Sequence, residues 1–184
     1  SMLVEGRKRA EAGQRADRVA VVGIGGLGHL ALQFARAWGC EVTALTTNLA
    51  KAEEAKRFGA HHVESLEELP DLAGRFDLVI NTVNHPLDWG AVMASLAPLG
   101  RLHQLGAVLE PISVGAFDLI PGRRSITGSP TSSHASLMKM VEFCVRHNIR
   151  PQVEHLPMDR LNEAIERLRR GDVRYRFVLD SVAD

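Results

Sequence analysis

Three glycines, Gly23, Gly25 and Gly28, have the spacing G-x-G-x-x-G directly after a short run of small and β-branched residues. This spacing suits pyrophosphate binding, because each glycine removes a side chain where the backbone turns sharply or approaches another group. Gly23 allows a tight turn after a strand, Gly25 lets the backbone come close to phosphates, and Gly28 lets a following helix pack closely. The N–H groups that begin that helix would favour the phosphate charge. The candidate phosphate-binding turn comprises Gly23, Ile24, Gly25, Gly26, Leu27 and Gly28.

The same spacing occurs in ordinary turns, so the elements around it decide its meaning. Before it, residues 19–22 predict a buried parallel strand. After it, apolar residues recur at helical spacing as far as Gly39, which predicts a helix that buries one face. The residues expected on that face are Leu27, Leu30, Ala31, Phe34, Ala35 and Trp38. A second strand follows at 41–45, and the resulting βαβ unit favours a nucleotide site over a bare structural loop.

Strands and helices alternate through the remainder of the first 150 residues. We expect strands at 61–64, 76–80, 100–105 and 125–127, helices at 49–58, 89–96 and 134–147, and a loose turn at 66–72. This alternation predicts an α/β Rossmann fold: a doubly wound, mostly parallel six-stranded sheet in the order 3-2-1-4-5-6. We therefore expect a nucleotide-binding domain at 18–150. A C-terminal strand–helix–strand tail follows at 151–184, with Asp159 capping its helix.

The end of the second expected strand indicates which nucleotide is bound. A site for NAD has an acidic residue about 20 positions after the first glycine, where it holds the ribose hydroxyls. That region here reads Thr46, Thr47 and Asn48, without a carboxylate, and Lys51 follows one helical turn later. Hydroxyl, amide and ammonium groups can donate to a 2′-phosphate, which favours NADP. Thr46 and Asn48 would serve equally well as caps of the next helix, and the two roles are compatible.

Composition excludes several other classes of protein. The chain has 184 residues, of which 45% are hydrophobic and 24% charged, and its formal net charge is zero. Without a basic surplus, a run of ~18 apolar residues or an apolar leader, we expect neither nucleic-acid binding, a membrane span nor a signal peptide. The two distant cysteines, Cys40 and Cys144, predict reduced thiols in a cytoplasmic protein and exclude a disulfide framework or a cysteine-rich zinc site. Ser1 and Met2 are typical of a cloning remnant before a start methionine.

Six segments carry a resemblance to a known family: GIGGLGHLALQFARAWG, TTNLAKAEEAKRFGA, FDLVINTV, LGA, ITGS and GDVRYRFVLD. In this order they resemble the zinc-dependent, medium-chain alcohol dehydrogenases, and most closely the NADP-preferring branch of cinnamyl-alcohol-dehydrogenase-like enzymes. The resemblance covers about residues 6–180. It implies an oxidoreductase that transfers hydride between NADP(H) and a small aldehyde or primary alcohol.

The resemblance also assigns roles to matching positions. It places the pyrophosphate on residues 23–28 and the adenosine 2′-phosphate on Thr46, Thr47, Asn48 and Lys51. The residues that it places beside the ribose and nicotinamide are Thr82, Val83, Leu105, Gly106, Ala107, Gly128 and Ser129. Arg176 matches an arginine that contacts the pyrophosphate, although a solvated charge on an edge strand explains it as well. The family forms homodimers through an edge strand, which here would be Ser125, Ile126 and Thr127.

The chain departs from the family pattern in two places. Residues 130–133 read P-T-S-S where the family usually has a further glycine, so we expect a stiffer loop. Before the first strand, residues 1–17 resemble only the end of a lead-in helix. The family's zinc ligands and most of its substrate pocket lie in a preceding domain, which has no counterpart here. We therefore expect no catalytic residue and no metal ligand in a truncated, cofactor-binding part that binds NADPH without turnover.

A stand-alone NADPH-binding module or partner subunit would use the same residues equally well. A short-chain reductase needs a Tyr-x-x-x-Lys pair on a helix, but Leu179 stands four positions after the single tyrosine, Tyr175. The histidines expected to be surface or capping residues are His29, His61, His62 and His147. The apolar stripe expected to be exposed, or to self-associate, is Leu161, Ile165 and Leu168.

Overall fold

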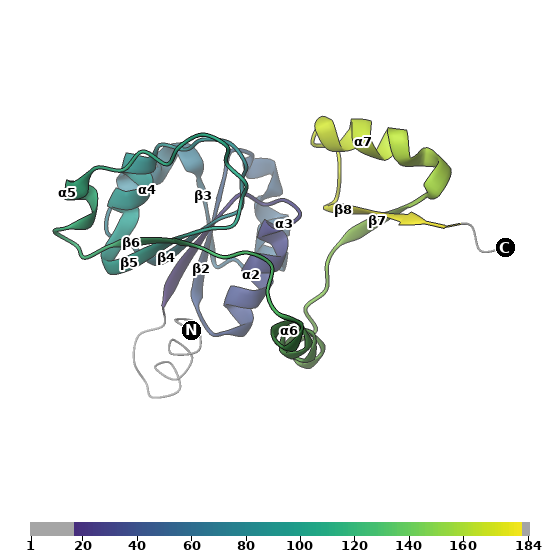
Figure 1. Cartoon of the computed structure of the whole chain (residues 1–184), viewed down its shortest axis with the longest axis horizontal. Coiled ribbons are helices and arrows are strands. Elements are labelled where there is room, and N and C mark those ends of the chain that lie inside the picture. The colour runs from purple at the N-terminus through teal and green to yellow at the C-terminus, as the bar shows by residue number, and fades with distance from the viewer. Residues whose placement is uncertain (1–16, 182–184) are drawn as a thin grey trace. The chain divides into compact units, whose positions relative to one another are not determined.

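The computed structural model describes residues 17–181. By its internal contacts the chain divides into two compact units, at residues 1–149 and 150–184. The first unit contains a parallel β-sheet with helices, and the second contains two strands and one helix (Figure 1).

The sheet of the first unit has the order β3-β2-β1-β4-β5-β6. All neighbouring strands run parallel. Its strands are β1 (Arg18–Val22), β2 (Glu41–Thr46), β3 (His62–Ser65), β4 (Phe76–Asn81), β5 (Leu96–Gln104) and β6 (Ser125–Gly128). Both the predicted fold class and the predicted strand order are confirmed. The order reverses between β1 and β4, which opens a crevice at the carboxyl ends of these two strands.

Helices cover both faces of this sheet, with α2 and α3 on one side and α4 on the other (Figure 1). The helical elements are α2 (Gly28–Ala37), η1 (Leu49–Lys51), α3 (Ala52–Arg57), η2 (Leu66–Leu72), α4 (Trp89–Ser95), α5 (Ala116–Leu119) and α6 (His134–His147). The helix predicted at 49–58 is divided into η1 and α3. The short helix α5 was not predicted.

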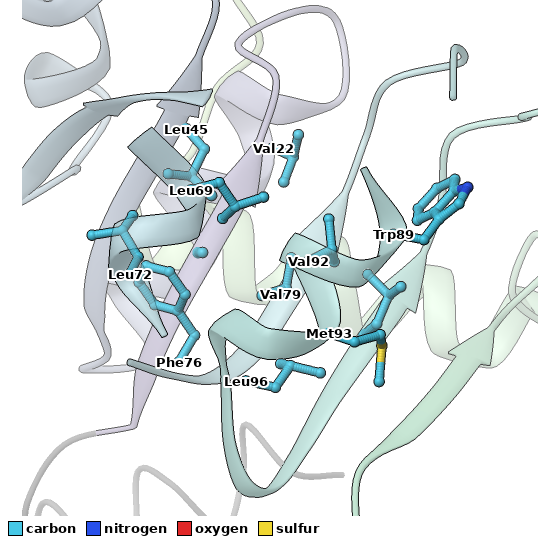
Figure 2. Close-up of a cluster of buried hydrophobic side chains, with 12 residues drawn as sticks. Val22, Leu45, Leu69, Leu72, Phe76, Val79, Trp89, Val92, Met93 and Leu96 are labelled. Atoms are coloured by element: carbon cyan, nitrogen blue, oxygen red, sulfur yellow. The ribbon is translucent and has the colours of Figure 1, made fainter. Parts of the chain in front are cut away.

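The main hydrophobic core lies between the sheet and the pair formed by α4 and η2. Figure 2 shows the side chains of this cluster, which include Trp89 and Met93 of α4 and Leu69 and Leu72 of η2. Phe76 of β4 belongs to the same cluster and is 1% exposed. Burial of side chains of this size stabilises a fold by about 1.5–3 kcal/mol each. This core therefore holds the sheet in the shape that opens the crevice.

The buried face of α2 differs from the prediction. The residues of α2 that are buried are Gly28, His29, Leu32 and Ala35. His29, expected at the surface or in a cap, is fully buried, and its Nδ1 lies 2.9 Å from the carbonyl oxygen of Gly25. Phe34 and Trp38 instead form part of a stack with Phe143 of α6, whose ring centroid lies 4.9 Å from that of Trp38. The residues of α2 thus pack against two neighbouring parts of the fold rather than one.

The second unit is a small βαβ motif. Its elements are β7 (Val153–Pro157), η3 (Met158–Arg160), α7 (Leu161–Arg169) and β8 (Arg176–Asp180), and β7 pairs with β8 in parallel. Asp159 lies inside η3 and does not cap α7, whose flanking residue Arg160 makes no side-chain cap. The prediction of that cap was wrong, because an intervening 3₁₀ turn separates Asp159 from the helix.

Candidate functional site

The carboxyl ends of β1, β2 and β4 surround a cleft of about 320 Å³. The residues that line it are Val22, Gly23, Ile24, Gly25, Leu45, Thr46, Thr47, Asn48, Lys51, Leu66, Thr82, Val83, Asn84 and His85. The position follows from the topology, since ligands of doubly wound sheets bind outside the carboxyl ends of the strands where the order reverses.

The glycine turn at one wall of the cleft is shaped by close contacts. Gly23 has a φ of +87°, and its N–H donates to the carbonyl oxygen of Leu45 at 2.9 Å. A Cβ on Gly23 would lie 2.5 Å from Cγ1 of Val83, and a Cβ on Gly28 would lie 1.9 Å from the carbonyl oxygen of Gly23. Both positions therefore require glycine for the fold itself.

Gly25 is different, because a Cβ added there would have no heavy atom within 4 Å. A side chain at Gly25 would instead enter the space in front of the turn. The helix behind the turn, α2, has ten residues, no acidic residue in its first turn and no side-chain cap. A bare backbone turn at a helix N-terminus fits the pyrophosphate of a dinucleotide, which uses backbone N–H groups and the positive end of the helix dipole.

A second part of the cleft lining comes from the end of β2 and the turn after it. Thr46 is buried, and its Oγ1 accepts a hydrogen bond from the N–H of Asn48 at 3.1 Å. Asn48 caps η1, since its Oδ1 accepts from the N–H of Ala50 at 3.0 Å. The capping role of Asn48 is therefore present in the structure. Lys51, at the end of η1, also lines the cleft.

The charge of the cleft lining favours an anion. Among the described residues that line it, none is Asp or Glu, while Lys51 is basic. A carboxylate at the end of β2 would accept hydrogen bonds from ribose hydroxyls and repel a 2′-phosphate. The hydroxyl of Thr46 donates to the carbonyl oxygen of Asn48 at 3.4 Å. Thr47 is exposed and its hydroxyl can donate to a phosphate, and Lys51 supplies a charge that strengthens such a contact.

The loops after β4 and β5 are packed against each other. Thr82 donates through its Oγ1 to the carbonyl oxygen of Val22 at 2.7 Å, which ties the end of β4 to the end of β1. A Cβ on Gly106 would lie 1.8 Å from the carbonyl oxygen of Val83, so that only glycine fits there. Leu105 is 41% exposed beside this contact.

The sequence profile of the family described as zinc-binding dehydrogenase matches residues 26–146. The chain belongs to this family. The aldehyde reductase AdhA of Synechocystis sp. is 48% identical over 165 residues, a match that covers 88% of this chain and 49% of that protein. NADP-dependent alcohol dehydrogenase C 1 of Mycolicibacterium smegmatis is 43% identical over 169 residues, covering 90% of this chain and 48% of that protein.

A solved structure agrees with these relatives. The cinnamyl alcohol dehydrogenase of Sorghum bicolor superposes with a TM-score of 0.85 at 32% identity, covering 97% of this chain and 52% of that one. The chain thus spans about half the length of the curated relatives that it matches. The first unit has the doubly wound fold that commonly binds dinucleotides.

The structure gathers part of the predicted cofactor site in this family member. The predicted residues that line the cleft are Gly23, Ile24, Gly25, Thr46, Thr47, Asn48, Lys51, Thr82 and Val83. Leu105, Gly106 and Ala107 follow β5, and Gly128 and Ser129 end or follow β6, so they lie at the same edge of the sheet without lining the cleft. Arg176 begins β8 in the second unit and is exposed.

Sequence reasoning missed several residues of the lining. Leu66 directly follows β3, and Asn84 and His85 follow β4. The rule that ligands bind at the carboxyl ends of parallel strands could have found all three, because the ends of β3 and β4 were already expected nearby.

Within residues 17–181 the structure has no group of three or more His, Cys, Asp or Glu side chains that could hold a metal ion. Burial raises the pKa of Cys40 to about 11, with a smaller contribution from the charge of Asp17. No helix within these described residues combines the length and apolar character needed to cross a membrane.

Proposed function

We propose that this chain is the NADP(H)-binding part of an alcohol dehydrogenase or aldehyde reductase. One observation carries the proposal: residues of a glycine turn and a lysine line the same cleft, whose described lining has no carboxylate. The first feature suits a pyrophosphate and the second suits a 2′-phosphate. The printed names of the relatives, aldehyde reductase and NADP-dependent alcohol dehydrogenase, supply the reaction class.

In this proposal, different groups of residues bind different parts of the cofactor. The turn at 23–28, of which Gly23, Ile24 and Gly25 line the cleft, holds the pyrophosphate together with the start of α2. The 2′-phosphate is held by Thr46, Thr47, Asn48 and Lys51, which all line the cleft. Thr82 and Val83 lie beside the ribose, and the loops at 105–107 and 128–129 extend toward the nicotinamide. Bound NADPH would supply a hydride to the carbonyl carbon of an aldehyde. The chain's own residues bind and orient the cofactor, and none of them is assigned an acid, base or Lewis-acid role.

The proposal can be tested directly on the chain alone. The family resemblance implies that the zinc and most of the substrate pocket belong to the half of these enzymes that the chain does not match. The chain alone should therefore bind NADPH without reducing aldehydes. Isothermal titration with NADPH should show one site, and NADPH consumption with an aldehyde and added Zn²⁺ should stay at background. Zinc-dependent turnover by the chain alone, or no NADPH binding, would contradict the proposal.

We also propose that the first unit forms a homodimer through β6. This strand lies at the edge of the sheet, and exposed apolar side chains, Leu109, Phe117 and Ile120, precede it. An unpaired strand edge beside apolar surface favours pairing with a second copy. A monomeric mass in light scattering would count against the dimer.

A cytoplasmic location is consistent with the two cysteines, which are free thiols.

A further inference from the structure

Two amide side chains behind the cleft, Asn81 and Gln104, are joined in a hydrogen-bond network. Asn81 ends β4 and is fully buried, and Gln104 ends β5 as its register partner. Asn81 donates through Nδ2 to Oε1 of Gln104 at 3.0 Å, and Gln104 donates through Nε2 to the carbonyl oxygen of Gly106 at 2.6 Å. The N–H of Val83 donates to Oδ1 of Asn81 at 3.2 Å.

We propose that this amide pair is a positioning device for the cofactor cleft. It joins the loop after β4 to the loop after β5 and thereby sets where Val83 lies against the glycine turn. The proposal rests on the proposed function, because it concerns the same cofactor. Neither amide is part of the cleft lining, so the pair acts through Val83 and Gly106.

The groups at its two ends determine the direction of the network. The carbonyl oxygen of Gly106 can only accept, so Gln104 must present its NH₂ group there and its Oε1 to Asn81. The N–H of Val83 can only donate, so Asn81 must present Oδ1 to it and Nδ2 to Gln104. Each amide therefore has one allowed orientation. A carboxylate at either position would place two acceptors face to face, and at the fully buried Asn81 water cannot replace the lost hydrogen bond.

The network reaches the cleft through packed backbone. The carbonyl oxygen of Asn81 accepts from the N–H groups of Leu105 and Gly106, both at 3.0 Å. The same two loops touch where a Cβ on Gly106 would lie 1.8 Å from the carbonyl oxygen of Val83. On its other side, Cγ1 of Val83 lies 2.5 Å from the place of a Cβ on Gly23. A shift of Val83 would therefore move one wall of the cleft against the phosphate-binding turn.

The experiment compares NADPH affinity and backbone amide signals in isosteric variants. Gln104→Glu keeps the shape and reverses the polarity at Gly106, and Gln104→Met keeps the length and removes both hydrogen bonds. Gln104 is half-buried, so both variants are expected to fold, and thermal unfolding checks this. Asn162→Asp, at an exposed position of α7 in the second unit, makes a matched amide-to-carboxylate change away from the cleft.

We expect NADPH to bind roughly tenfold more weakly to both Gln104 variants, as the loss of a buried hydrogen-bond partner predicts. The ¹H–¹⁵N signals of Val83 and Gly106 should shift, while the Asn162→Asp variant should match the wild type in both measurements. Unchanged affinity in folded Gln104 variants would overturn the positioning role, and so would an unchanged Val83 signal. If the wild type and Asn162→Asp also fail to bind NADPH, the proposed function itself is wrong, and the inference falls with it.

Discussion

The carbonyl oxygen of Gly23 occupies the space that a side chain on Gly28 would need, since a Cβ there would lie 1.9 Å from it. Gly25, between them, faces open space. The motif therefore contains two kinds of glycine. Gly23 and Gly28 are required by the fold, whereas Gly25 is required only if something binds in front of the turn.

Alanine substitutions should separate these two kinds. Gly28→Ala should lower the free energy of unfolding by about 1–3 kcal/mol or more, because overpacking against backbone cannot be relieved by a rotamer change. Gly25→Ala should leave the unfolding midpoint unchanged and weaken NADPH binding by about tenfold or more, because the methyl group would occupy the phosphate side of the turn. Thermal unfolding and NADPH titration measure the two effects. A Gly25→Ala variant with wild-type affinity would place the pyrophosphate elsewhere.

The centre of the sheet was predictable because β1, β2 and β4 are short, mostly apolar runs between turn residues. The face of α2 was not, because two faces of the helix, which share Ala35, follow its helical period. The predicted set includes Phe34 and Trp38, which pack on Phe143 of α6. The buried set includes His29 and Leu32. The partner that divides them is distant in sequence, and no local pattern identifies it.

The part of the cleft lined by the glycine turn and by residues 46–51 was predictable for a related reason. Its residues belong to one βαβ unit and the turn after β4, so local spacing already brings them together. The Asn81–Gln104 network joins two strands that are neighbours only in the folded sheet. In the sequence, an amide residue after an apolar run only indicates where the strand ends. Its hydrogen-bond partner can be identified only once the register between the two strands is known.

Lys51 should distinguish NADPH from NADH. Removing a phosphate-binding charge by Lys51→Ala should weaken NADPH binding by about tenfold, and NADH binding should change little, because NADH lacks the 2′-phosphate. Parallel titrations with the two cofactors measure this difference. Lys56→Ala is a suitable control, since Lys56 forms an exposed ion pair with Glu53 at 2.9 Å and does not line the cleft. Equal affinities of the wild type for NADPH and NADH would refute the 2′-phosphate site.

The apolar stripe of α7 offers a test that does not involve the cofactor. Leu161, Ile165 and Leu168 are 43%, 38% and 58% exposed, whereas Ala164 on the same helix is 5% exposed. Replacing the three exposed residues with Gln should reduce self-association and leave the unfolding midpoint unchanged, because exposed apolar surface favours association. Ala164→Gln, by contrast, should destabilise the unit. Light scattering and thermal unfolding measure both results, and clear destabilisation by the triple variant would show that the stripe is needed inside the fold.

Glu154 should make the second unit sensitive to acid. Its carboxylate accepts from Nη2 of Arg167 and from the N–H of Arg174, both at 2.6 Å. The hydrogen bond from Arg167, opposed by partial burial, holds the pKa of Glu154 below its usual value of 4.5. A lowered folded-state pKa means that the stabilisation is present above about pH 4.5 and is lost as the pH falls through the lowered pKa.

Hydrogen exchange of the Arg174 amide reports on this contact directly. In the wild type its protection should decrease below about pH 4.5, after correction for the intrinsic rate, because protonated Glu154 binds Arg167 less strongly. Glu154→Gln should show reduced protection already at pH 6 and no further decrease at lower pH. Glu166→Gln removes the same charge from an exposed position of α7 and should leave the Arg174 amide unchanged. A wild-type profile in the Glu154→Gln variant would mean that the β7–β8 pairing protects this amide without the ion pair.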